Sequence, residues 1–314
     1  MNIMSPRLQG ALTAVAAGAL SAGAIVTSQA VQLGLDSFLT GTNPAAAEYD
    51  PATEVGNFNN LVGQGPNLSG WTGNWLEAFG GSISAEAVTT GLSFPDVFSA
   101  GGSINHNMLD GGGRSGRLLT APFNDATTGT FYLSFLMQLE SVDANFYAAF
   151  ELHNGGFDDG ANRKLQIAVG EGGLTGSQGI PADHFSVRLF NNNDSANLSE
   201  DLGLSDTNVH LFVVRFDFGT DNDADAISVW IDPDPTMAEN LQTPDYTHSG
   251  FNLQVDRTSI ASFGPAGTIG VSWDEFRQAT AWEDLFNTPD PDSDNDDMDD
   301  TWEIANGLIV GIDD

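Results

Sequence analysis

Short runs in which apolar and polar residues alternate recur along most of this chain, and they constrain its fold more than any other feature. In one of them the apolar residues occupy every second position: Phe131, Leu133, Phe135, Met137 and Leu139. A period of two places successive side chains on opposite faces of a β-strand. The same alternation recurs at residues 146–152, 165–169, 185–189, 227–231 and 269–273. These runs predict strands that turn one face to a core.

Glycine, asparagine, aspartate and proline separate the predicted strands, and the intervening sequence shows no sustained helical period. Residues 209–214 are apolar on both faces, as is typical of a strand buried from both sides. A short helix is predicted at residues 281–285, directly after the last strand. This succession predicts an all-β fold over residues 31–287, namely a two-sheet antiparallel β-sandwich of the jelly-roll type.

Residues 1–30 have the composition of a secretory signal peptide. Arg7 precedes an alanine- and glycine-rich stretch at residues 10–26, and Ser28-Gln29-Ala30 forms a small-x-small cleavage motif. The alternative is a membrane anchor, which we disfavour because the stretch is short and weakly apolar. We therefore expect cleavage after Ala30, no membrane insertion after cleavage, and a protein that is secreted or displayed at the cell surface.

The charge balance limits the partners of this chain. Its 43 acidic residues face 9 basic ones, for a formal net charge of −34 at pH 7. Such a charge repels phosphate backbones and anionic membranes, so we expect no nucleic-acid binding, whereas divalent cations are favoured as ligands. The chain contains no cysteine, which excludes disulfides and thiolate metal sites.

An aspartate-rich segment near the C-terminus has the ligand spacing of a calcium loop. Calcium takes oxygen ligands, and a twelve-residue loop supplies them from positions 1, 3, 5, 7, 9 and 12, with the backbone carbonyl at position 7. Counted from Asp292, these positions hold Asp292, Asp294, Asp296, Met298, Asp300 and Glu303. Position 6, where glycine is usual, is Asp297. We predict a calcium site here, followed by a short helix at residues 302–308.

This segment resembles the calcium-binding repeats of the thrombospondin type 3 kind found in bacterial surface proteins. The resemblance implies that residues 288–314 form a spacer that calcium makes rigid. The alternative is a solvated acidic linker, since blocks of like charge are usually disordered.

Several motifs in the strand region also resemble a known family. They lie at residues 35–38, 69–75, 131–136, 210–217, 229–233 and 273–277. Together they are similar to the concanavalin A-like, laminin-G-like sandwich domains of secreted bacterial proteins. The resemblance implies the jelly-roll fold and, by analogy with relatives on that fold, a carbohydrate or a cell-surface polymer as partner.

Trp71 and Trp75 are candidate ligand-binding residues, because an exposed indole offers an apolar face on which a sugar ring can stack. Gly70 and Gly73 flank Trp71, which makes it the better candidate of the two. The alternative, which we prefer, is that the rings fill the edge of the sandwich. A second acidic cluster at residues 217–225, centred on Asp221, either binds another ion or forms an aspartate-rich turn, and the turn is favoured.

The sequence provides no catalytic motif to which we can assign residues. Asp274 and Glu275 are adjacent, so their side chains point to opposite faces of a strand and cannot act as the carboxylate pair of a glycosidase. The five histidines are far apart and lack zinc-binding spacing. We therefore predict a secreted, non-catalytic module that binds a glycan or a surface polymer and carries a calcium-rigidified spacer. The alternatives are an adhesive domain that binds another protein, and a divergent polysaccharide hydrolase or lyase.

Overall fold

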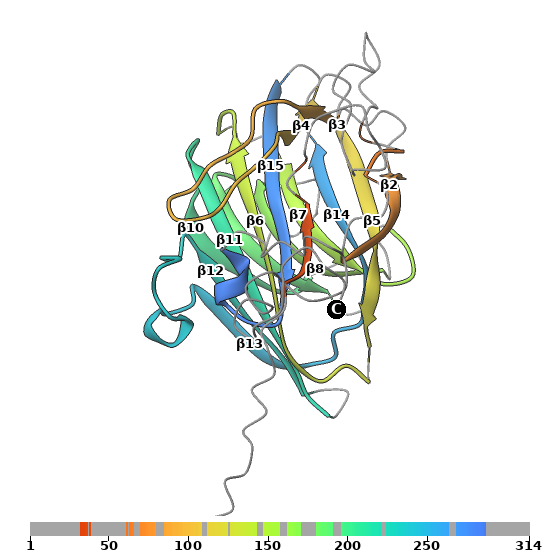
Figure 1. Cartoon of the computed structure of the whole chain (residues 1–314), viewed down its shortest axis with the longest axis vertical. Helices are drawn as coiled ribbons and strands as arrows, with labels where there is room; N and C mark the ends of the chain where they lie inside the picture. The colour runs from red at the N-terminus through yellow and green to blue at the C-terminus, as the bar shows by residue number, and fades with distance from the viewer. Residues whose placement is uncertain are drawn as a thin grey trace, which may run out of the picture.

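The alternating runs form the strands of two antiparallel sheets that pack face to face (Figure 1). The computed structural model describes the following residues: 32–36, 38, 61, 63–65, 70–79, 85–108, 112–124, 126–142, 147–157, 162–170, 180–190, 196–220, 224–263 and 268–286. Within them the predicted two-sheet antiparallel sandwich is confirmed.

One sheet has eight strands. In spatial order they are β13 (Tyr246–Phe251), β12 (Asp225–Ile231), β11 (Val209–Phe218), β6 (Gly129–Leu139), β15 (Thr268–Ala279), β4 (Ser103–Met108) and β3 (Ala85–Val88), and β1 (Gln32–Asp36) also pairs with β15. Strands β6 and β11 are continuously paired from Gly129 opposite Phe218 to Gln138 opposite Val209. Neighbours in this sheet are therefore often far apart in the sequence.

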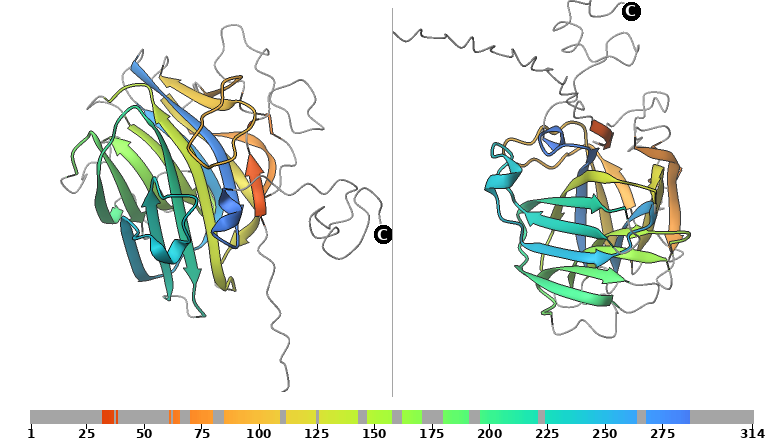
Figure 2. Two further views of the ribbon diagram at one scale, coloured as in Figure 1. Left: turned by 60° about the vertical axis from the view of Figure 1, so that its left-hand side comes forward. Right: turned by 90° about the horizontal axis from the view of Figure 1, so that it is seen from below.

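The other sheet has seven strands. In spatial order they are β10 (Ala196–Leu204), β9 (His184–Phe190), β8 (Arg163–Gly170), β7 (Tyr147–His153), β14 (Val255–Phe263), β5 (Gly112–Phe123) and β2 (Trp71–Phe79). Strand β14 lies between β7 and β5, so a segment from late in the chain is placed between two earlier ones. The view from below in Figure 2 shows the two sheets as separate layers.

The main core lies between the two sheets. Every apolar residue of the alternating run in β6 contributes to it, as the sequence predicted. At its centre the ring of Phe135 lies 4.7 Å from that of Phe150 on the opposite sheet and 5.1 Å from that of Phe212. Aromatic rings bury large apolar areas, so this stack contributes strongly to the attraction between the sheets.

A second apolar cluster covers the outer face of the eight-stranded sheet. Its fully or nearly fully buried members include Tyr132, Leu136, Leu211, Val213, Trp230, Trp282, Leu285 and Phe286. The predicted helix after the last strand is present as the short 3₁₀ helix η3 (Glu283–Leu285), and it closes this cluster. A second 3₁₀ helix, η2 (Glu239–Leu241), joins it, because Tyr132 donates a hydrogen bond to Glu239 at 2.6 Å. The prediction that residues 209–214 are buried from both sides is thereby confirmed for residues 210–214 of β11, whereas Val209 is only partly buried.

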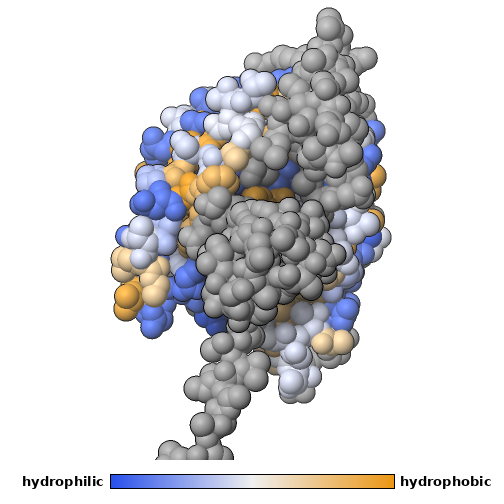
Figure 3. All heavy atoms as spheres, in the orientation of Figure 1, coloured by the Kyte–Doolittle hydropathy of each residue, from blue (hydrophilic) through white to orange (hydrophobic). Residues whose placement is uncertain are grey.

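On the face that Figure 3 shows, polar residues predominate among the described ones, and apolar residues gather at a few places between them. The most exposed large apolar side chains among the described residues are Leu204, at 71%, and Leu241, at 69%. None of the helices in the described part of the chain is long and apolar enough to cross a membrane.

Several sequence predictions lie outside the described residues. They are the signal peptide at residues 1–30, the calcium loop at residues 292–303 and the helix at residues 302–308. These stay predictions, and so do the exact limits of the sandwich at residues 31 and 287.

Candidate functional site

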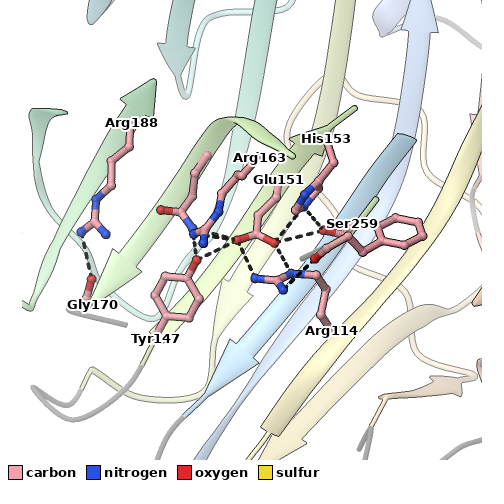
Figure 4. Close-up of polar contacts among 10 residues, drawn as sticks. Arg114, Tyr147, Glu151, His153, Arg163, Gly170, Arg188 and Ser259 are labelled. Carbon is pink, nitrogen blue, oxygen red and sulfur yellow. Dashed lines mark hydrogen bonds and ion pairs between the residues drawn. The ribbon is translucent and has the colours of Figure 1, made fainter. Parts of the chain in front are cut away.

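The outer face of the seven-stranded sheet carries a cluster of polar side chains. On β7, Ala148, Phe150 and Leu152 belong to the main core, so Tyr147 and Glu151 at alternate positions point to the other face. Strands β5, β8, β9 and β14 add further polar residues on the same side (Figure 4). We call this set the polar network; its members are Arg114, Tyr147, Glu151, His153, Arg163, Gln166, Arg188 and Ser259.

The carboxylate of Glu151 lies at the centre of the polar network. Arg114 binds it through two nitrogen atoms: Nε contacts Oε2, and Nη2 donates to Oε1 at 3.2 Å. Nη1 of Arg163 lies 3.3 Å from Oε1. Such paired guanidinium contacts are among the strongest hydrogen bonds to a carboxylate. The ion pair between Arg114 on β5 and Glu151 on β7 therefore links these two strands across the intervening strand β14.

Neutral donors complete the surroundings of Glu151. Its Oε1 atom accepts hydrogen bonds from the Tyr147 hydroxyl at 3.0 Å and from Gln166 Nε2 at 2.8 Å. Its Oε2 atom accepts one from the Ser259 hydroxyl at 3.1 Å. Gln166 also donates to the Tyr147 hydroxyl. Because rigid strands carry all of these groups, the network is preorganised.

The protonation states follow from burial and charge. Burial alone raises the pKa of Glu151, but the positive charges of Arg114 and Arg163 and a hydrogen bond from His153 outweigh it, so this pKa lies well below its usual value. Burial, reinforced by the charge of Glu151, raises the pKa of Tyr147, and the hydroxyl stays protonated. Burial also lowers the pKa of His153, against the opposing effect of Glu151. At neutral pH the network thus contains a carboxylate, neutral Tyr147 and neutral His153.

The geometry around His153 does not form a catalytic triad. Its Nε2 atom lies 2.9 Å from the Ser259 hydroxyl oxygen and 3.2 Å from Glu151 Oε2. An ionised carboxylate only accepts hydrogen bonds, so Nε2 carries the ring proton and cannot remove one from Ser259. A triad requires the carboxylate at the other ring nitrogen. That atom, Nδ1, is buried and has no hydrogen-bond partner within the described structure.

Aromatic rings border the polar network. The guanidinium of Arg163 lies 4.7 Å from the centre of the Phe190 ring. The half-buried ring of Phe157 lies 5.8 Å from that of His153, and the Phe157 carbonyl accepts a hydrogen bond from Arg114 at 3.0 Å. A Cβ atom on Gly116 would lie 2.2 Å from Cε1 of Phe157. Glycine at this position of β5 therefore gives the Phe157 ring its place at the edge of the network.

The sequence analysis did not identify this cluster. It interpreted the apolar positions of β7, β8 and β9 and left the intervening polar ones unassigned. A signal was nevertheless present, because Arg163 and Arg188 are two of only 9 basic residues in the chain and each lies in or beside a predicted strand. Arginine at such a position is rarely buried without a partner. Arg114 gave no such signal, because no strand was predicted around it.

Trp71 and Trp75 lie in the main core, and each is 4% exposed. The indole of Trp71 donates a hydrogen bond to the Thr258 hydroxyl at 3.1 Å, and the guanidinium of Arg117 lies 5.8 Å from its ring. Arg117 is in turn paired with the buried Asp36 at 2.9 Å. Both rings are thus buried inside the sandwich, in agreement with the alternative that the sequence analysis preferred. Sugar stacking on them stays a prediction, and their burial gives it no support.

The acidic residues at the ends of β11 and β12 accept hydrogen bonds from neighbouring groups of the chain itself. Asp217 accepts hydrogen bonds from Arg215 at 2.8 Å and from Thr130 at 2.7 Å. Asp225 accepts the backbone N–H groups of Gly219 and Leu253. These contacts favour the turn interpretation, whereas Asp221 itself lies outside the described residues. Across the residues that the structure describes, no group of three or more histidine or acidic side chains is arranged to hold a metal.

Asp274 and Glu275, the adjacent acidic residues considered from the sequence, hold a loop in place. Asp274 accepts the backbone N–H of Leu92 at 2.7 Å, and Glu275 accepts that of Ala100 at 2.8 Å. Burial, together with the negative charge of Glu275, raises the pKa of Asp274 well above its usual value. These contacts fasten the loop at residues 89–102 to β15.

Comparisons with known proteins concern the fold. No protein family and no curated protein matches this chain. Among solved structures, the potassium-bound carbohydrate recognition domain of Emp46p is 10% identical, with 59% of this chain and 86% of that chain covered and a TM-score of 0.41. A legume lectin-like domain from Entamoeba histolytica is 9% identical, with 62% and 88% covered and a TM-score of 0.39. The protein of unknown function SO2946 from Shewanella oneidensis MR-1 is 10% identical, with 80% and 87% covered and a TM-score of 0.42.

Proposed function

We propose that this protein is a non-catalytic glycan-binding module and that the outer face of its seven-stranded sheet is the ligand-binding face. The observation that carries the proposal is the polar network, in which planar side chains on adjacent strands present donors and acceptors in fixed positions. Two of its buried acceptors, His153 Nδ1 and Gln166 Oε1, have no hydrogen-bond partner within the described structure. A buried acceptor without a donor costs about 1–3 kcal/mol, and a sugar hydroxyl supplies that donor.

The protonation states favour binding over catalysis. General acid–base chemistry works best with a group whose pKa lies near the working pH. The pKa of Glu151 is displaced downward and that of Tyr147 upward, both away from neutrality. These two groups therefore keep one protonation state at neutral pH, as hydrogen-bonding side chains of a binding site do.

Ligand binding must uncover the network, since Glu151, His153 and Gln166 are each 0% exposed in the free chain. Phe157 is a half-buried side chain at its edge, where it lies on Gly116 and beside His153. In this proposal the sugar takes the place of the Phe157 ring. An apolar sugar face and an aromatic ring can replace one another in such a position.

A glycan array followed by calorimetry tests the proposal. Gln166→Leu keeps a similar volume but removes the amide, so the affinity for a glycan found on the array is expected to fall at least tenfold. Ser186→Ala is the matched control, because Ser186 is buried in the same sheet outside the network and its hydroxyl donates a hydrogen bond to the Ala168 carbonyl, at 3.4 Å. An array without any bound glycan, or equal affinities of both variants, would contradict this assignment.

We also propose that the protein is exported and that residues 292–303 bind calcium. The signal-peptide composition of residues 1–30 and the oxygen spacing from Asp292 to Glu303 support this. Calcium would neutralise part of the tail's charge and order it. Calorimetric calcium binding should be lost in an Asp294→Ala, Glu303→Ala double variant, with Asp234→Ala as the control. Export predicts that the mature protein begins at Val31, which N-terminal sequencing checks.

A further inference from the structure

We infer that one edge of the sandwich carries a binding site for an organic ammonium group. Strand β13 stands at one end of the strand order of the eight-stranded sheet, and β10 stands at one end of that of the seven-stranded sheet. The site consists of three aromatic side chains of β13, which we call the aromatic row, and of Glu200 on β10; the row is Tyr246, His248 and Phe251. It shares no residue with the polar network, and the inference does not depend on glycan binding there.

The rings of the aromatic row follow one another along β13. The centres of the Tyr246 and His248 rings are 6.4 Å apart and their planes differ by 12°, and the His248 and Phe251 rings are 5.6 Å apart at 31°. Gly250, at φ +86°, is an extra residue in the pairing with β12 and brings Phe251 back to the face of the row. All three side chains are only partly buried, so the row is accessible from solvent.

Glu200 points toward the same side of the sandwich interior from the opposite sheet. It pairs with Val187 of the main core, as Tyr246 pairs with Val229, and directly opposite residues of antiparallel strands share a face. Leu202 of β10 packs against the same core as Tyr246. Burial and the negative charge of Glu200 both raise the pKa of Tyr246, so the carboxylate lies close enough to act on the row. Glu200 itself is exposed.

Aromatic rings beside a carboxylate favour an organic cation. The face of an aromatic ring attracts a cation that lies within about 6 Å of its centre, and a carboxylate adds a full opposite charge. The guanidinium–ring contacts of the described residues involve other rings, such as those of Trp71, Phe190 and Phe157. A net charge of −34 also concentrates cations at the surface. Calcium requires several oxygen ligands, whereas an ammonium group with apolar substituents uses both the rings and the single carboxylate.

NMR titrations of the full chain with matched probes test this inference. Choline is compared with its neutral isostere, in which a tert-butyl group replaces the trimethylammonium group, and glucosamine is compared with N-acetylglucosamine. At least one cationic probe is expected to bind about fivefold or more tightly than its neutral counterpart and to shift the resonances of the aromatic row. The preferred cation distinguishes a quaternary from a primary ammonium group. The buffer is mildly alkaline, above the usual titration range of histidine.

Two charge variants locate the site. Glu200→Gln removes the carboxylate charge beside the row, whereas Glu77→Gln removes the same charge from the exposed surface of β2, at the opposite edge of the same sheet. The preference for the cation should be lost in Glu200→Gln and kept in Glu77→Gln. Tyr246→Leu keeps an apolar side chain against the core but removes the ring, and it should also weaken the preference. Thermal unfolding checks that each variant is folded.

Three results would overturn the inference. Equal affinity for a cation and its neutral counterpart, for both pairs of probes, would exclude the ammonium group as the recognised feature. Equal losses in Glu200→Gln and Glu77→Gln would mean that cations bind diffusely through the net charge. If neither cation shifts the resonances of the aromatic row, the rings only pack against the core. The glycan array tests the proposed function separately, so it can fail or succeed whatever these titrations show.

Discussion

The outer faces of the two sheets are built from similar strands but have opposite chemistry. The eight-stranded sheet carries an apolar cluster that the chain's own helix η3 and the loop at residues 89–102 close, whereas the seven-stranded sheet carries the polar network around Glu151. Apolar burial is non-directional and stabilises any close packing. Buried charges require specific partners. The comparison teaches that one outer face is stabilised by non-directional apolar packing, whereas the other, for which we propose glycan binding, depends on specific polar partners.

Removal of the central carboxylate should have the largest effect on the polar face. Glu151→Ala removes the carboxylate that the guanidiniums of Arg114 and Arg163 both contact, and breaking a buried ion pair costs about 3–5 kcal/mol. Urea unfolding measures this change in the free energy of unfolding. The exposed Glu77 on β2 offers the control, because Glu77→Ala should change it by less than about 0.5 kcal/mol. Similar values for both variants would mean that the network does not stabilise the sheet.

A truncation on the apolar face should destabilise the protein without affecting ligand binding. Leu136 is 0% exposed in the cluster under η3, and Leu136→Ala is expected to cost about 3 kcal/mol through lost burial and the resulting cavity. The affinity for a glycan that binds the wild type should stay the same in calorimetry. A parallel loss of affinity in the folded variant would show that the two faces are coupled.

The contact between Gly116 and Phe157 offers a smaller perturbation at the edge of the polar face. A Cβ atom at Gly116 would lie 2.2 Å from the Phe157 ring, so Gly116→Ala forces the ring away at a cost of about 1–3 kcal/mol. In the Gly116→Ala, Phe157→Ala double variant that clash is absent. A double-mutant cycle of unfolding free energies should therefore show strong coupling. Additive effects would place the ring elsewhere.

The smallest expected effects are those of pH, and they differ between the sheets. The pKa of Glu151 is lowered in the folded state, so its stabilisation is present above the unfolded value of 4.5 and is lost as pH falls through the folded pKa. On β11, burial lowers the pKa of His210, but the carboxylates of Asp232 and Asp206 outweigh this and raise it. Its stabilisation is present below the unfolded value of 6.5 and is lost as pH rises through the folded pKa.

Unfolding free energies measured between about pH 3 and about pH 9 check both directions. Glu151→Gln should flatten the acid limb of the stability profile, and His210→Gln should flatten the limb above pH 6.5. The reverse assignment, with His210→Gln acting in acid, would show that the carboxylates around His210 do not hold its proton in the folded state.

The sequence by itself determined the strands and the class of fold. Alternation at Phe131, Leu133 and Phe135 is a local property, because successive residues of a strand point to opposite faces of the sheet. The structure places all three side chains in the main core. The both-sided burial of residues 209–214 could be predicted for the same reason. The short helix at residues 281–285 was also predictable, because it interrupts the alternation directly after the last strand.

Only the tertiary structure decided which strands lie side by side. Arg114 and Glu151 meet across 37 residues of sequence, and Ser259 reaches Glu151 across 108, because β14 is inserted between β5 and β7. Alternation assigns a residue to a face but carries no information on strand order. The polar network therefore could not be predicted, although the sequence contains each of its residues, because their proximity depends on strand order. A local pattern sets which way a side chain points, and long-range strand pairing sets what it meets there.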